Sequence, residues 1–133
     1  MENITSVKIL KLAFWIGAIT DGLAAMIMIF PTLRIYIFGS DNVEITPAYR
    51  YSLGMGAALM VGWTVLLLWG SIKPVERRGL LVITVFPVIS GIVVAQIYAV
   101  KSGYIDLSSM IPVWIHLTLI SSLFLFAYYK SKK

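Results

Sequence analysis

The chain has 133 residues, of which 59% are hydrophobic and only 13% are charged. Soluble globular domains carry about 25% charged residues, so this composition excludes an ordinary soluble domain and indicates an integral membrane protein. The formal net charge is +5, but the basic residues form no patch long enough to follow a nucleic acid backbone, so we expect no nucleic acid partner.

Four long apolar stretches cover residues 12–30, 51–70, 80–100 and 110–129. A helix that crosses a bilayer needs about 20 predominantly apolar residues, so each stretch is long enough for one crossing. The sequence therefore predicts an all-α integral membrane protein, in which residues 1–133 form a single domain. Its four transmembrane helices, at about residues 7–30, 47–70, 74–102 and 109–129, are expected to form an antiparallel up-down bundle.

The connection after the first helix begins with an apolar segment at about residues 31–39. Tyr36 and Phe38 in this segment are suited to the headgroup layer, so we expect it to lie at the membrane interface. Two interpretations stay open: a connecting loop that rests on lipid, or a cover over an outward-facing cavity.

Proline, glycine and threonine residues mark the other helix ends. Thr46 and Pro47 form a capping residue and first-turn proline for the second helix, and Pro74 is expected to open the third. Gly103 is placed to end the third helix in a left-handed conformation. Pro87 lies inside that helix and predicts a kink, because proline removes one backbone hydrogen bond.

The basic residues also predict the orientation. Eight lie at the amino end, in the second loop or in the carboxyl tail: Lys8, Lys11, Lys73, Arg77, Arg78, Lys130, Lys132 and Lys133. The other two loops hold three: Arg34, Arg50 and Lys101. The positive-inside rule then places both termini in the cytoplasm, and we expect a multi-pass protein of the plasma (inner) membrane.

Asp21 is the only acidic or basic residue deep inside any of the four apolar stretches. A carboxylate near the bilayer midplane costs about 2.5–3.5 kcal/mol on insertion scales, so it usually faces a protein interior or a water-filled cavity and marks function. At 1.5 Å per residue, Asp21 lies ~13 Å from the inner end of its helix, near the middle of a ~30 Å hydrocarbon core.

Other polar residues are predicted at middle or outer depth. His116 lies ~9 Å and Gln96 ~6 Å below the outer ends of their helices, and the axial offset between Asp21 and His116 is ~6 Å. Arg50 and Tyr51 begin the second helix on the same side. These positions predict an outward-opening cavity. The alternative is structural, with Asp21 bonded to neighbouring hydroxyl groups and His116 to water or a loop carbonyl group.

Two tryptophans, Trp15 and Trp63, lie deeper than the other aromatic residues that anchor helices at the interfaces. They either line an apolar ligand pocket or pack in the core.

Small residues recur at a spacing of four and predict close helix packing. The three ridges are Ala18 and Gly22; Gly54, Ala58 and Gly62; and Gly91, Ala95 and Ala99. We expect them to hold the bundle together, and one of them is a candidate face for a homodimer.

Signatures of catalysis are sparse. The chain has no cysteine and one histidine, and it lacks phosphate-binding and nucleophile-elbow motifs, so we expect no metal and no cofactor and assign no catalytic residue. The prediction is a membrane protein that binds or transports a small cation or an amphiphilic, lipid-like molecule around Asp21. One alternative is an intramembrane enzyme of the isomerase type, acting on a lipid or sterol-like substrate with Asp21 and His116 as acid and base. The other is a non-catalytic structural subunit of a larger membrane complex.

Overall fold

The computed structural model describes residues 4–33 and 44–132, and their regular structure is helical throughout. The elements are α1 (Ile4–Ile29), α3 (Pro47–Ile72), α4 (Gly79–Ile83), η1 (Thr84–Ile89), α5 (Ser90–Lys101) and α6 (Leu107–Lys130). Because α4, η1 and α5 follow one another directly, they form one span. Within these residues, four helices are long and apolar enough to cross a membrane, which confirms the predicted all-helical structure with four apolar spans.

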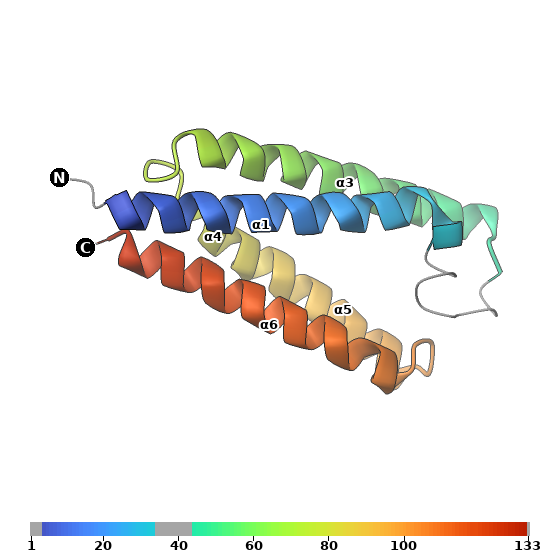
Figure 1. Ribbon diagram of the computed structural model, residues 1–133. Helices are drawn as coiled ribbons and strands as arrows, with labels where there is room; N and C mark the ends of the chain where they lie inside the picture. The colour runs from blue at the N-terminus through green and yellow to red at the C-terminus, as the bar shows by residue number, and fades with distance from the viewer. Residues whose placement is uncertain (1–3, 34–43, 133) are drawn as a thin grey trace.

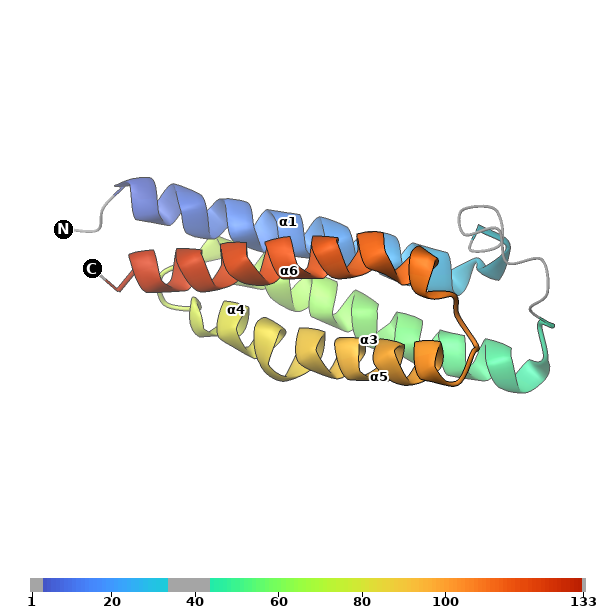
Figure 2. The same ribbon diagram turned by 90° about the horizontal axis from the view of Figure 1, so that it is seen from below.

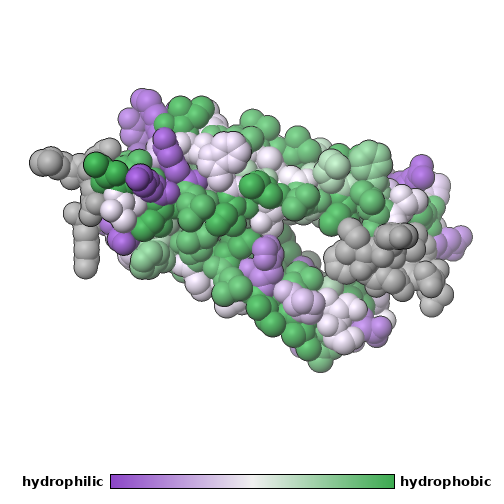
Figure 3. Space-filling view, in the orientation of Figure 1, coloured by the Kyte–Doolittle hydropathy of each residue, from purple (hydrophilic) through white to green (hydrophobic). Residues whose placement is uncertain are grey.

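The surface of the helices has the polarity that a lipid environment requires. Large apolar side chains such as Ile19, Leu23, Val65 and Leu119 are more than half exposed on the sides of the bundle. Figure 3 shows this apolar surface along the helices, with hydrophilic residues gathered mostly at the two ends. Such side chains gain nothing from contact with water, so their exposure is explained by contact with lipid tails.

The four spans form two hairpins, α1 with α3 and α4–α5 with α6 (Figure 1). The start of α1 and the end of α6 lie at one end of the molecule in both views (Figure 1 and Figure 2), together with the turn at residues 73–78. We call this the terminal end, and the end with the turn at residues 102–106 the distal end. The hairpins lie close together at the terminal end and diverge toward the distal end (Figure 1).

The packed core lies in the terminal half. Its buried residues come from all four spans: Leu10, Ala13, Phe14, Ala18, Leu67, Leu81, Val85, Ile89, Ile120, Phe124 and Ala127. In the distal half α5 has no buried residue at all, and the residues buried on the other helices there are Ala25, Ala57 and Met110. Apolar packing therefore fixes the hairpins together over only part of their length.

Two aromatic rings in the core lie against glycines. The Phe14 ring of α1 covers Gly70 of α3 so closely that a Cβ atom there would overlap it. A Cβ atom on Gly17 of α1 would lie 2.7 Å from Cζ of Phe124 on α6. These two glycines allow the helix backbones to approach, although neither belongs to the predicted ridges.

The predicted ridges behave differently from one another. Ala18 is buried, and Gly22 lies against Thr64 of α3, so this ridge packs as expected. By contrast, a Cβ atom on Gly62 or Gly91 would meet no atom within 4 Å. The same is true of Gly54, so the ridges of α3 and α5 do not hold this chain's own helices together at their glycines.

Polar contacts join the chain segments at the terminal end. The Arg78 guanidinium donates to the carbonyl oxygen of Ser131 at 2.6 Å, and the Ser6 hydroxyl donates to that of Lys130 at 3.4 Å. Arg77 lies over the Trp69 ring, 3.4 Å from its centroid, and donates to the Trp69 carbonyl oxygen. The carboxyl end of α6 is thus bound to α1 and to the turn at residues 73–78.

Several predicted helix ends are present. Thr46 caps α3 by accepting a hydrogen bond from the Tyr49 backbone N–H at 3.2 Å, and Gly103 has a φ of 72°. The predicted kink is also present, since Phe86, next to Pro87, leaves the helical region with φ −125° and ψ 109°.

The remaining boundaries differ in detail. The third span begins at Gly79 rather than at Pro74, because residues 74–78 form turns. Residues 31–33 are helical, and residues 34–39 of the expected interfacial segment lie outside the described residues.

The glycine contacts make a stability prediction. Gly70→Val places a branched side chain into the Phe14 ring and is expected to lower the free energy of unfolding by about 1–3 kcal/mol through overpacking. Gly62→Val, on the same helix with open space around it, is the matched control and should change stability by no more than about 0.5 kcal/mol. Denaturation of the purified chain in mixed micelles measures both, and equal losses would contradict this account of the core.

Candidate functional site

Asp21 lies on the inner face of α1, immediately beyond the core. It comes four residues after Gly17 and four residues before the buried Ala25. Side chains four residues apart on an α-helix differ in direction by only about 40°, so the three lie on one face. Gly17 faces Phe124 of α6, so Asp21 points between the hairpins one helical turn closer to the distal end. The carboxylate is half-buried.

No hydrogen bond or ion pair joins Asp21 to any other described residue. The structural alternative for Asp21, a network of neighbouring hydroxyl donors, is therefore not formed here. Within a membrane span, a half-buried carboxylate without a protein partner is most readily stabilised by water or by a bound cation.

His116 has a matching position on the facing helix. It precedes the core residue Ile120 by four residues and lies on its distal side, so on α6 it too stands one turn beyond the core. Its side chain is exposed, and no hydrogen bond or ion pair connects it to Asp21. Figure 1 shows that α1 and α6 diverge toward the distal end, which explains why similar positions along the two helices do not lead to a hydrogen bond or ion pair.

The other predicted site residues are not gathered around Asp21. The Gln96 side-chain carbonyl of α5 accepts a hydrogen bond from the Trp114 indole of α6 at 2.9 Å, which joins the second hairpin in its distal half. Trp15 and Tyr51 are 52% and 70% exposed on the sides of the bundle, so neither lines an internal pocket.

Trp63 links the two hairpins. Its indole N–H donates to the Thr84 hydroxyl at 3.1 Å, and this hydroxyl donates to the Leu80 carbonyl oxygen at 2.7 Å. Thr84 is buried, at 3% exposure, and Trp63 packs against the core, so the second of its two predicted interpretations, core packing, describes it.

No protein-family model, curated protein or solved structure matches this chain. The site must be interpreted from its own chemistry. Among the described residues, no three His, Asp or Glu side chains lie close enough together to hold a metal ion. What the structure presents is one carboxylate at the inner edge of the diverging region, without a bonded partner among the described residues, and one exposed imidazole on α6 that does not bond to it.

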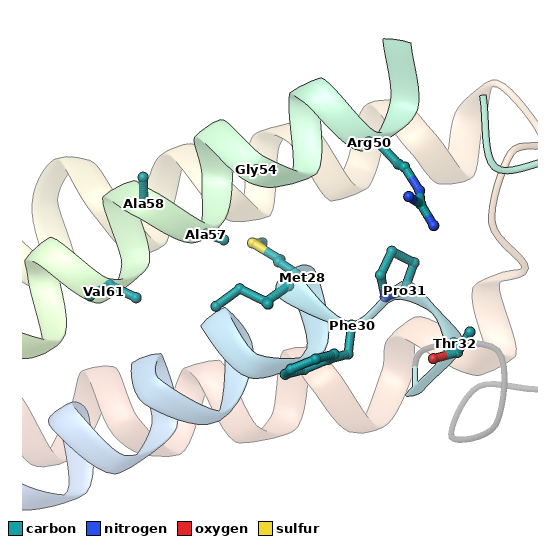
Figure 4. A pocket seen from close by; sticks show the side chains of 10 residues that line it. Met28, Phe30, Pro31, Thr32, Arg50, Gly54, Ala57, Ala58 and Val61 are labelled. Atoms are coloured by element: carbon teal, nitrogen blue, oxygen red, sulfur yellow. The ribbon is translucent and has the colours of Figure 1, made fainter. Parts of the chain in front are cut away.

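A separate pocket lies between the distal ends of α1 and α3, and we call it the distal pocket (Figure 4). From the first helix and the residues after it, it is lined by Met28, Ile29, Phe30, Pro31 and Thr32. From α3 it is lined by Arg50, Gly54, Ala57, Ala58 and Val61. Its volume is about 760 Å³. Asp21 is not among the lining residues, so Arg50 belongs to this pocket and not to a shared cavity with Asp21.

The small residues of α3 are the sequence feature that relates to the distal pocket, but their spacing alone did not predict a pocket. The small residues of α3 were expected to bring another helix close, but Gly54 and Ala58 instead leave space beside the end of α1. The lining from Met28 to Thr32 depends on how the chain leaves α1, which periodicity does not predict.

The link between Trp63 and Thr84 makes a second prediction. Trp63→Phe removes the donor but leaves the Thr84 hydroxyl bonded to Leu80, so it should cost about 0.5–1.5 kcal/mol in the hydrogen bond itself. Thr84→Val leaves the partly buried indole N–H without an acceptor and should cost more, about 1–3 kcal/mol. Unfolding in mixed micelles tests the order of the two losses, and a smaller loss for Thr84→Val would show that the hydrogen bond does not join the hairpins.

Proposed function

We propose that this chain is an integral membrane protein that binds a small cation or a cationic amphiphile between its two hairpins, with Asp21 as the counter-ion. One observation carries the proposal: a carboxylate without a partner among the described residues lies on the inner face of α1, where the packed core ends. The energetic cost of that carboxylate within a membrane is offset when it pairs with a positive charge.

The divergence of the hairpins supports access to Asp21 from the distal side. The space-filling surface is open between the hairpins toward the distal end, and a hydrophilic spot borders this opening (Figure 3). The positive-inside rule predicts that the terminal end is cytoplasmic, and with this orientation the proposed opening faces the outer side of the membrane.

The core of the terminal half favours binding over transport by a single chain. Leu10, Phe14, Leu67, Leu81 and Phe124 are fully or almost fully buried on the terminal side of Asp21 and fill the space between the spans. A pathway through this region requires the core to separate, so transport would need a second conformation or a second copy. The enzyme alternative has less support, because His116 does not bond to Asp21 and so does not form an acid–base pair with it.

A second candidate function, a structural subunit or homodimer, has one observation in its favour. Gly91 and Ala95 form an exposed face of α5, and a Cβ atom on Gly91 would meet nothing within 4 Å. Small residues on a lipid-facing helix allow another helix to approach closely.

Cation binding is tested with tetraphenylphosphonium and the full chain in phosphatidylcholine nanodiscs. Asp21→Asn should raise the dissociation constant about tenfold or more, because a charge-assisted contact contributes about 1.5–3 kcal/mol. Asp106→Asn, which removes an exposed carboxylate before α6, is the matched control and should bind as the native chain does. Tetraphenylborate, the anion of the same shape, should show no dependence on Asp21. Equal affinity of the native and Asp21→Asn chains for the cation would reject the proposal.

Self-association is tested by the fraction of dimer in detergent. Gly91→Leu should lower this fraction if α5 forms the interface, since the larger side chain separates the two helices. Gly62→Leu, on the exposed face of α3, identifies whether that helix is used instead. A native chain that is monomeric at every ratio of detergent to protein would exclude the homodimer.

A further inference from the structure

We propose that the distal pocket binds one anionic phospholipid, with the phosphate at Arg50 and an acyl chain along the apolar wall. The inference rests on a different part of the molecule from Asp21 and concerns a ligand of opposite charge. It is independent of the function proposed above.

The wall of the pocket has the chemistry of a site for a hydrocarbon chain. Met28, Phe30 and Val61 provide apolar surface, while Gly54 and Ala58 are small enough to leave the space open. The volume of about 760 Å³ falls in the usual range of 300–1,000 Å³ for ligand pockets. An acyl chain needs no hydrogen-bond partners on this apolar wall. The pocket also lies between two spans that we expect lipid to surround.

The charge at the mouth of the pocket indicates an anion. Figure 4 shows the Arg50 side chain extending from α3 toward Pro31 and Thr32. Among the described residues no carboxylate pairs with Arg50. The ion pair that these residues do form joins Lys73 to Glu76 at the other end of the molecule. The guanidinium is therefore available for a ligand, and Thr32, which carries a hydroxyl donor, also lines the pocket.

Phosphate is the anion that suits this donor best. A guanidinium presents its N–H groups in a planar fork that matches two phosphate oxygens at once. Arg50 lies in the first turn of α3, where the apolar span meets the headgroup layer, so a phospholipid already in the bilayer has its phosphate at this level. A free fatty acid also combines an anion with a chain, and the experiment separates the two ligands.

The test is lipid retention by the full chain, measured by native mass spectrometry with phosphatidylglycerol, phosphatidylcholine or palmitate added. The native chain should retain phosphatidylglycerol in preference to both of the others. Arg50→Gln should weaken this retention about tenfold, as expected for the loss of a charged hydrogen-bonding group. Lys101→Gln removes a basic side chain from the distal end of the other hairpin and should change it by less than about twofold, because this charge is exposed.

A second pair of variants tests the pocket rather than the charge. Gly54→Leu places a larger side chain on the pocket lining, where a Cβ atom would meet nothing within 4 Å, and it should weaken retention of phosphatidylglycerol. Gly62→Leu adds the same side chain outside the pocket and should not. Unchanged unfolding of Gly54→Leu shows that the loss comes from the pocket itself.

Three outcomes would overturn the proposal: equal retention of all three ligands, preference for palmitate, or native retention by both Arg50→Gln and Gly54→Leu. Asp21→Asn should retain phosphatidylglycerol as the native chain does, and Arg50→Gln should still bind tetraphenylphosphonium. If one of the two binding proposals fails, the test of the other is therefore unaffected.

Discussion

The structure depends on two aromatic rings that lie against two glycines in the terminal half. Lipid tails are as apolar as the side chains of the spans, so helices in a bilayer associate by close contact rather than by escape from water. Phe14 against Gly70 joins α1 to α3, and Phe124 against Gly17 joins α6 to α1. Around these contacts the buried residues of all four spans meet, and beyond them the two hairpins are free to diverge.

The end of the core divides the molecule into two chemical regions. On its distal side the α1 face no longer meets α6 in the shared core, although Ala25 is still buried, and there the chain carries a carboxylate instead of another apolar residue. Farther along, between α1 and α3 alone, an apolar pocket ends at a guanidinium. Opposite charges thus occupy different spaces, Asp21 between the hairpins and Arg50 within the first hairpin. We propose that the two spaces hold ligands of opposite charge.

The sequence predicted the features that are local to one helix. Thr46, Pro87 and Gly103 marked a cap, a kink and a left-handed turn because each residue restricts its own backbone, and four apolar stretches gave four spans. What it did not predict was which faces meet. Gly54 and Gly91 have the spacing of packing residues, but a Cβ atom on either would meet nothing within 4 Å, while Gly70 packs tightly without belonging to a ridge. The depths of Asp21 and His116 followed from helix rise, but their separation depends on the angle between hairpins, which is set by packing far from either residue.

The divergence of the hairpins has a consequence for the membrane itself. A body whose spans touch at one end and separate at the other occupies more area in one leaflet than in its counterpart (Figure 1). The polar contacts of Arg78 and Ser6 hold the narrow end fixed, so a change in separation is confined to the wide end. If the spans lie in a bilayer as proposed, lateral pressure in that leaflet would act on the angle between the hairpins. We therefore expect the width of the space beside Asp21 to depend on the shape of the lipids around it.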